Sequence, residues 1–268
     1  MIRLGWFSSG RDQAAQDLLE GVYKNSINRD QSIKISFVFS NRELGQNDQS
    51  DCFLELVRQY GIPSITVSSR QFEPALRRKD TSEWRRAYDS QIIRSLEGLE
   101  CDLCVLAGYM LITSPLLCTE YTMINLHPAL PWGPPGTWQE VIWKLIKAHA
   151  SESGTMMHLV TPDLDKGPPV TYCKYPIRGP AFDEAWKEIE STSLAALKRE
   201  QGECNSLFKT IRHHGFVREL PLLLATIEAL SIGIVRIREG LVLDRENQPI
   251  QGYDLTQEIT PITEIGLP

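Results

Sequence analysis

The chain alternates short apolar runs with longer segments in which apolar residues recur every three or four positions. The short runs predict buried strands at residues 2–10, 34–41, 62–68, 101–108, 123–130, 154–162 and 170–177. The helical spacing predicts helices at residues 11–27, 50–61, 70–100, 137–151, 181–201 and 216–231. Alternation of this kind predicts an α/β fold, an open, mostly parallel twisted sheet flanked by helices. A C-terminal helix and a closing hairpin, formed by residues 232–255, complete it.

Within the predicted helix at residues 70–100, Trp84, Tyr88, Ile92 and Leu96 recur at steps of four. Such a stripe is the face that a surface helix buries. Two basic clusters, residues 77–79 and 85–86, interrupt this segment, and we interpret both as solvated helix faces. The prediction is therefore one amphipathic helix that packs its aromatic stripe on the sheet.

The composition narrows the class of protein. A hydrophobic content of 42%, with 23% charged residues, is ordinary for a globular chain of 268 residues. The net charge of −6 argues against a nucleic-acid partner held by a basic surface. No apolar run approaches the roughly 18 residues of a membrane span, and the N-terminal residues do not resemble a signal peptide. We therefore expect a cytoplasmic protein without a membrane partner.

The six cysteines are scattered over predicted strands and helices, which favours reduced thiols. Cys101 and Cys104 form a C-x-x-C pair on a predicted buried strand, but no second pair accompanies them. We interpret the pair as structural and expect no metal site. His158, in the middle of a predicted strand, is interpreted as a core or surface residue.

Two polar residues stand out in the apolar run at residues 123–130. Side chains alternate along a strand, so Asn125 and His127 project to the same side, at its end. An amide donor and an imidazole would lie together there. Structural residues satisfied by loop backbone would fit the same spacing, and the pair alone leaves both interpretations open.

Three segments decide between these interpretations: N-L-H-P at residues 125–128, L-D-K-G-P at 164–168 and LAGYMLITSP at 106–115. In this order and spacing they resemble the folate-dependent formyltransferases, and within these the phosphoribosylglycinamide formyltransferases. The resemblance implies a Rossmann-like fold and a single domain over residues 1–268. It also implies that the charged helical stretch at about residues 181–205 is an insertion.

By this resemblance Asn125, His127 and Asp165 are the catalytic residues, and 10-formyltetrahydrofolate is the formyl donor. Asn125 and His127 would donate hydrogen bonds to the oxyanion that forms during transfer. Asp165 would hold the imidazole and favour its charged form. The resemblance also places the folate-binding residues at Met110, Leu111, Ile112, Cys118, Val160, Thr161, Asp163 and Leu164. Relatives often carry arginine at the position of Leu111.

The implied acceptor is a small-molecule amine that carries a phosphate, first of all glycinamide ribonucleotide in purine synthesis. It would meet Pro128 and the first strand-to-helix loop, where free backbone N–H groups favour anions. That loop contributes Ser9, Gly10, Arg11 and Asp12. Three departures fall on this side: one glycine in the loop where relatives have two, the sequence LPWGPPGTW after residue 129, and Phe216-Val217 where relatives have an acidic residue and a histidine.

These departures leave other acceptors open. An amino-sugar nucleotide is one alternative, and a methionyl-tRNA would require a basic face that the composition does not indicate. Hydrolysis of the formyl group is a further variant of the chemistry. A non-catalytic folate- or nucleotide-binding relative is the remaining interpretation, and the joint presence of the three catalytic residues argues against it. A homodimer is compatible with the sequence.

Overall fold

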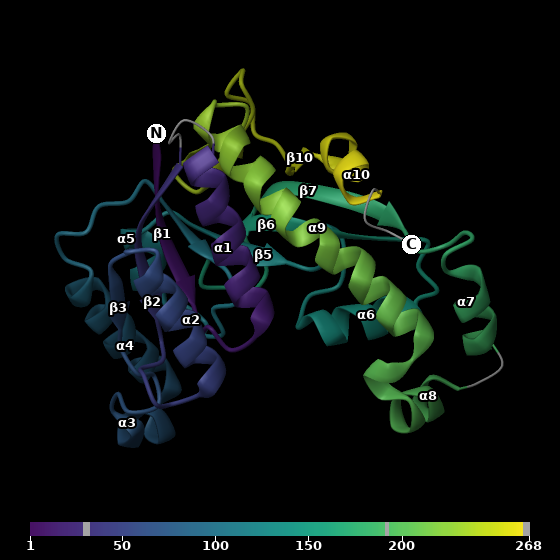
Figure 1. Ribbon diagram of the computed structural model, residues 1–268, viewed down its shortest axis with the longest axis horizontal. Helices are drawn as coiled ribbons and strands as arrows, with labels where there is room; N and C mark the ends of the chain where they lie inside the picture. Colours follow the sequence, from purple (N-terminus) through teal and green to yellow (C-terminus); the bar gives the residue numbers. More distant parts are fainter. Residues whose placement is uncertain (29–32, 191–192, 265–268) are drawn as a thin grey trace. The chain divides into compact units, whose positions relative to one another are not determined.

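The computed structural model describes residues 1–28, 33–190 and 193–264. Its main sheet has the strand order β10-β7-β6-β5-β4-β1-β2-β3. All the pairings described are parallel except β6 with β7, which is antiparallel. The predicted fold class, a mostly parallel sheet flanked by helices, is confirmed (Figure 1).

The chain divides into two compact units. The first comprises Met1–Asn125 with Leu159–Gly167, and the second comprises Leu126–His158 with Pro168–Pro268. The first unit contains β1 (Ile2–Ser8), α1 (Gln13–Asn28), β2 (Ile33–Ser40), α2 (Asp48–Gln59), β3 (Ser64–Thr66), α3 (Pro74–Lys79), α4 (Thr81–Ser95), β4 (Leu103–Leu106) and α5 (Pro115–Glu120). Strand β5 (Met123–His127) begins in the first unit and ends in the second.

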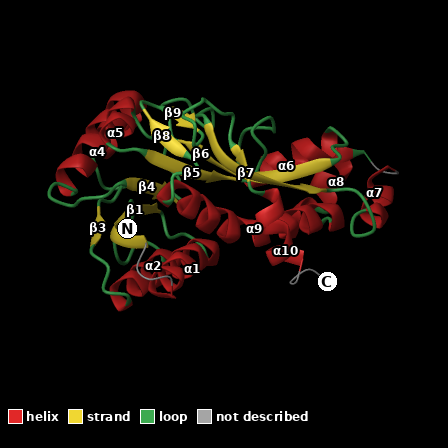
Figure 2. Ribbon diagram, turned by 90° about the horizontal axis from the view of Figure 1, so that it is seen from above, coloured by secondary structure: helices red, strands yellow, loops and turns green. Residues whose placement is uncertain are grey.

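In the first unit, α1 and α2 lie on one side of the strands and α4 and α5 on the other (Figure 2). The aromatic stripe of α4 is buried, as predicted, and packs with Phe7, Phe37 and Phe39 of the strands. The predicted single helix at residues 70–100 is wrong in one respect, because it is two helices. Asp80 ends α3 and caps α4, its carboxylate accepting the backbone N–H groups of Ser82 and Glu83 at 2.9 Å.

The second unit contains α6 (Trp138–Lys147), β6 (Glu152–Leu159), β7 (Pro169–Pro176), α7 (Asp183–Glu190), α8 (Leu194–Glu200) and a 3-10 turn at Gly202–Cys204. The long α9 (Ser206–Ser231), the strands β8 (Arg236–Arg238), β9 (Leu241–Leu243) and β10 (Tyr253–Asp254), and α10 (Thr256–Glu264) follow. Its core is formed by apolar side chains of α6, β7, α7 and α9, among them Trp186 and Phe208.

Two predicted helices of the second unit differ in the structure. Helix α9 starts at Ser206 rather than at residue 216, because Asn205 caps it by accepting the Phe208 N–H at 3.1 Å. Gly215 lies inside the helix where it passes the Tyr175 hydroxyl. The predicted helix at 181–201 is divided into α7 and α8, and residues 191–192 lie outside the described residues.

The predicted closing hairpin is confirmed for β8 and β9, which turn at Glu239 and Gly240 with φ of 49° and 76°, and Pro249 forms a further antiparallel bridge with Leu243. Residues with positive φ at both central positions are typical of a tight hairpin turn. Tyr253 and Asp254, expected in the hairpin, instead pair in parallel with β7. Helix α10 follows them, where the sequence analysis predicted no element.

Candidate active site

The first unit contains a topological switch point, since β1 pairs with β2 on one side and with β4 on the other. Ligands of open parallel sheets bind beyond the carboxyl ends of the strands at such a point. Two loops meet there. The Ser9 N–H donates to the Gly108 carbonyl at 3.1 Å, and the Met110 N–H donates to Ser9 Oγ at 3.1 Å. The loop after β1 is therefore fixed to the loop after β4.

The same serine starts a chain of buried side-chain hydrogen bonds across the strand ends. Ser9 Oγ donates to Asn41 Oδ1 at 2.6 Å, and Asn41 Nδ2 donates to Ser69 Oγ at 3.1 Å. All three residues are buried. Buried polar groups are costly unless they are paired. These hydrogen bonds therefore hold the loops at the carboxyl ends of the strands in a fixed arrangement.

The loop expected to hold the acceptor phosphate departs from a simple anion site. Gly10 has φ of +55°, and a Cβ there would lie 2.7 Å from the Phe53 ring, so only glycine fits. Asp12 Oδ1 accepts the Ala15 N–H at 3.1 Å, which places a carboxylate at the start of α1. Arg11 Nε lies 3.6 Å from the same carboxylate. The loop thus carries its own anion where a phosphate was expected.

The predicted folate segment follows β4. Met110 is 47% exposed, which excludes a core role for this side chain. Leu111 and Val160 are half-buried and pack on the apolar cluster of this unit, and Ile112 is half-buried as well. Cys118 Sγ lies 3.3 Å from Thr113 Oγ1, and burial raises the pKa of its thiol. These residues present apolar surface beside the switch point.

A buried carboxylate holds the far end of this segment. Asp89 of α4 is 3% exposed and accepts the Ser114 backbone N–H at 2.5 Å. Burial raises the pKa of Asp89, and the bond from Ser114 opposes that shift. The segment from Gly108 to Ser114 is therefore fixed at one end by Ser9 and at the other by Asp89.

The loop that carries Asp165 is closed on itself. An added Cβ at Gly167 would overlap the Leu159 carbonyl oxygen, so the end of the loop presses against its start. Within it, Thr161 Oγ1 donates to the Asp163 carbonyl at 3.1 Å, and Asp165 has φ of +56°. A left-handed non-glycine residue costs on the order of 1–3 kcal/mol and is typical of functional sites. Asp163 and Leu164 are exposed.

Strand β5 carries the other two predicted catalytic residues. Asn125 is half-buried, whereas His127, two positions on, is 4% exposed. The Val160 N–H donates to the Met123 carbonyl at 2.9 Å, which fixes the start of the Asp165 loop beside β5. Asn125 and Asp165 belong to the first unit and His127 to the second, as does Pro128, which is half-buried. Convergence of the three catalytic side chains stays a prediction.

His158 was interpreted from the sequence as a core or surface residue, and it lies in the core next to His127. His158 of β6 is buried, and its ring lies edge-on to that of His127, with centroids 6.0 Å apart and an interplanar angle of 86°. Both residues belong to the second unit. His158 therefore contacts the imidazole assigned to catalysis. Its signal in the sequence was a histidine inside the short apolar run from Met156 to Val160.

The described residues contain neither a cluster of metal ligands nor a helix that could cross a membrane. No group of three or more histidine, cysteine or acidic residues there is arranged to hold a metal ion. In the same part of the chain, no helix combines the length and apolar character that a membrane crossing requires.

Comparison with known proteins identifies the family. The model of the formyl transferase family matches residues 3–188, more than half of the chain. The chain therefore belongs to the formyl transferase family.

Two relatives from bacteria are both phosphoribosylglycinamide formyltransferases. The protein from Escherichia coli is 30% identical over 191 residues, which cover 70% of this chain and 79% of the relative. The protein from Haemophilus influenzae is 28% identical over 259 residues, which cover 94% of this chain and 99% of the relative. The predicted family resemblance is confirmed.

Solved structures agree in fold. The phosphoribosylglycinamide formyltransferase from Coxiella burnetii superimposes with a TM-score of 0.66 at 18% identity, covering 94% of this chain and 98% of that one. A formyltetrahydrofolate deformylase from Burkholderia mallei reaches 0.61 at 16% identity, covering 91% of this chain and 69% of that one. At these identities the likeness is one of fold alone.

Proposed function

We propose that this protein transfers a formyl group from 10-formyltetrahydrofolate to a primary amine, with glycinamide ribonucleotide as the first acceptor to test. The observation that carries the proposal is the end of β5, where an almost fully buried His127 follows Asn125 by two residues in a member of the formyl transferase family. A buried imidazole beside an amide at a strand end supplies the donors that acyl transfer needs.

The assigned roles follow from the chemistry. The neutral amine attacks the formyl carbon, so negative charge builds on the formyl oxygen and positive charge on the attacking nitrogen. Asn125, through Nδ2, and His127, as imidazolium, would donate hydrogen bonds to that oxygen. Asp165 would hold the imidazole and accept a hydrogen bond from a water molecule. Through this water the proton would move from the amine to the leaving nitrogen. The closed loop ending at Gly167 supports this role because it fixes the backbone of Asp165.

Apolar surface in the first unit supports a folate donor. Met110 and Leu164 expose 47% and 56% of their surface, although both are large hydrophobic residues. Val160 and Leu111 are half-buried in the same unit. Apolar walls with a few placed polar groups are typical of sites for planar ligands. We therefore assign the pterin ring to these residues.

The choice of acceptor depends on the loop after β1, which carries the carboxylate of Asp12. That carboxylate caps α1 and pairs with Arg11, so it opposes a phosphate at the same place. This observation favours a second candidate, an amine acceptor whose phosphate is absent or lies elsewhere, such as an amino-sugar nucleotide. Both candidates share the donor and the chemistry.

An absorbance assay with the purified protein tests the proposal. It measures the release of tetrahydrofolate from the donor. We expect turnover with glycinamide ribonucleotide or with an amino-sugar nucleotide, and none without an amine. Turnover that needs no amine would mean hydrolysis and would contradict the proposal. If no amine is formylated although the protein still binds folate, the protein is a non-catalytic relative instead.

The variant Asp12→Asn separates the two acceptors, because asparagine keeps the cap and removes the charge. If glycinamide ribonucleotide places its phosphate in the loop, we expect its KM to fall severalfold in the variant while kcat is unchanged. The KM of an acceptor bound elsewhere would not change. Arg11→Gln is the matched control, because it removes a positive charge from the same loop. In this variant we expect the KM to rise for an acceptor whose phosphate lies in the loop and for no other acceptor.

Location and assembly remain expectations. All six cysteines are free thiols, which suits the reducing cytoplasm in which we expect the reaction. A homodimer also stays a prediction. Sedimentation of the purified protein would decide between the monomer and the dimer.

A further inference from the structure

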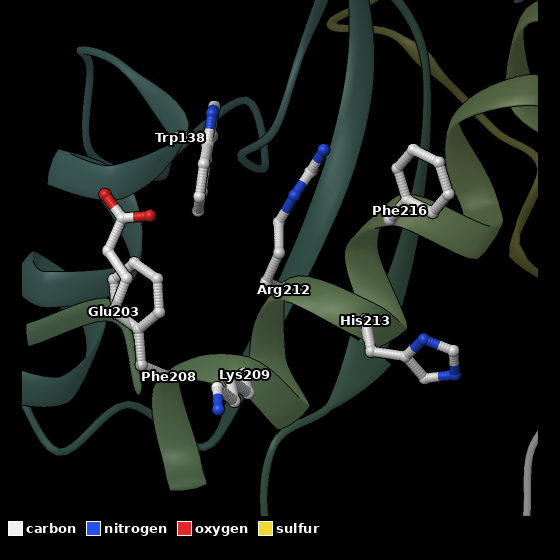
Figure 3. Close-up of a pocket in the computed structure, with 7 residues that line it drawn as sticks. All are labelled: Trp138, Glu203, Phe208, Lys209, Arg212, His213 and Phe216. Carbon is white, nitrogen blue, oxygen red and sulfur yellow. The ribbon is translucent and has the colours of Figure 1, made fainter. Parts of the chain in front are cut away.

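The second unit contains a cavity of about 270 Å³. It is lined by side chains from the start of α6, the 3-10 turn and one face of α9: Trp138, Glu203, Phe208, Lys209, Arg212, His213 and Phe216 (Figure 3). Its volume lies just below the range of about 300–1,000 Å³ found for small-molecule sites. Six of these seven residues lie after residue 188, outside the part matched by the family model.

Aromatic rings supply its walls. Phe208 and Phe216 are eight residues apart on α9, with Arg212 midway, so all three share one face of the helix. Trp138 faces them from α6 (Figure 3). A capping box fixes the first turn of α6, with the Thr137 N–H donating to Glu140 Oε2 at 2.8 Å. Trp138 is consequently held in place before any ligand arrives.

Arg212 is planar and lies among these rings. Its Cζ is 4.7 Å from the Trp138 ring centroid and 5.0 Å from that of Phe216. Its Nη1 donates to Glu219 Oε1 at 2.5 Å, and this ion pair is mostly buried. A guanidinium carries further N–H donors in a rigid plane, and it stacks on flat rings. Arg212 thus offers a ligand both a stacking surface and hydrogen-bond donors.

The charges around the cavity select against a cation. Lys209 and His213 are exposed beside Arg212 on α9, and Glu203 is the one acidic residue of the lining. A cationic ligand would meet Arg212 over the same aromatic faces that it needs. An anion would meet Lys209 and the guanidinium.

We propose that this cavity binds a planar aromatic anion, with the ring of the ligand stacked on the Arg212 guanidinium beside Trp138 and Phe216 and its phosphate or carboxylate held by Lys209 and Arg212. A purine nucleoside monophosphate has this chemistry. Glycinamide ribonucleotide carries a phosphate but no aromatic ring, so the site goes beyond the proposed reaction.

Calorimetric titration of the full chain with AMP tests the site, without folate or amine present. Two partial ligands accompany it, ribose 5-phosphate, which lacks the ring, and adenosine, which lacks the phosphate. We expect AMP to bind about tenfold more tightly than either. Absence of AMP binding, or ribose 5-phosphate binding as tightly as AMP, would overturn the proposal.

Variants then locate the binding. Lys209→Gln removes one charge, and Trp138→Leu removes one ring, so each should weaken AMP about tenfold. Trp138→Phe keeps a ring and should keep most of the affinity, which guards against a loss caused by misfolding. Lys147→Gln, an exposed lysine of α6 outside the lining, is the matched control. AMP affinity unchanged in Lys209→Gln and Trp138→Leu, or lost equally in Lys147→Gln, would exclude this cavity.

A final titration identifies the source of the aromatic anion. AMP binding is measured again with a saturating amine acceptor present. Unchanged affinity indicates a separate nucleotide ligand, and lost affinity indicates that the acceptor itself occupies the cavity. Both results retain the cavity as a site, and neither requires formyl transfer to be observed.

Discussion

The candidate sites in the two units use polar groups in different ways. In the first, buried serine, asparagine and aspartate side chains bond to one another and to backbone at the strand ends, as in the pair of Asp89 with the Ser114 N–H. In the second, basic side chains of α9 lie against aromatic rings, Arg212 over Trp138 and Arg218 over Tyr175. The first arrangement fixes loops, and the second presents charge beside flat surfaces.

The difference follows the extent of the match to the family model. Residues 3–188 match the family, and they include the whole of the first unit apart from residues 1 and 2. Helix α9 lies outside this match. We therefore expect the chemistry to depend on groups common to the family and ligand selection to depend on α9.

The largest expected effect is that of His127→Ala. Loss of an oxyanion donor should lower kcat by on the order of 10²-fold or more, with little change in donor affinity, because the interaction acts in the transition state. Steady-state rates and folate binding by calorimetry measure the two quantities. His149→Asn, a histidine of the same unit with φ of 48°, is the control and should keep full activity. A near-normal rate in His127→Ala would remove this residue from the mechanism.

The second prediction compares two glycines, one from each unit. Gly167→Ala forces a methyl group into the Leu159 carbonyl, so we expect a loss of about 1–3 kcal/mol in the free energy of unfolding. Gly215→Ala adds a methyl group within α9 that meets only the Tyr175 hydroxyl at 3.0 Å, and higher helix propensity offsets the contact. Its effect should stay within about 0.5 kcal/mol. Urea denaturation measures both, and equal effects would contradict the closed loop.

Much of the first unit could be predicted from the sequence, because its strands and the stripe from Trp84 to Leu96 follow simple periodicity. The break at Asp80 was missed since a cap inside a polar segment resembles any exposed aspartate. Long-range contacts carried no such signal. Neither the pairing of Asp89 with Ser114 nor the ring contact between His127 and His158 can be predicted from spacing, as each joins separate elements. The α9 cavity was missed for the same reason.

An effect of similar size is expected at Asp89, whose pKa is raised by burial. Asp89→Ala leaves the Ser114 N–H without its acceptor and should cost about 1–3 kcal/mol. Asp89→Asn keeps an acceptor and removes the buried charge, so its cost should be below about 1 kcal/mol. Because the folded state holds the proton more tightly, this group lowers the free energy of unfolding as pH rises through its folded pKa. Denaturation at several pH values should show that dependence in the wild type and not in Asp89→Asn.

The smallest effect has the opposite sign and lies in the second unit. Burial, with Arg218 and His213 nearby, lowers the pKa of His214 to about 4, while its ring packs on Tyr175 and Phe182. Between pH 6.5 and 4 the unfolded chain binds more protons, so stability falls as the pH falls through this window. His214 is half-exposed, and we expect only about 2–4 °C lower Tm at pH 5 than at pH 7 from this group. His214→Gln should remove that part of the fall and His149→Asn should not. An unchanged pH dependence in His214→Gln would show that burial in α9 leaves this imidazole free to take up its proton.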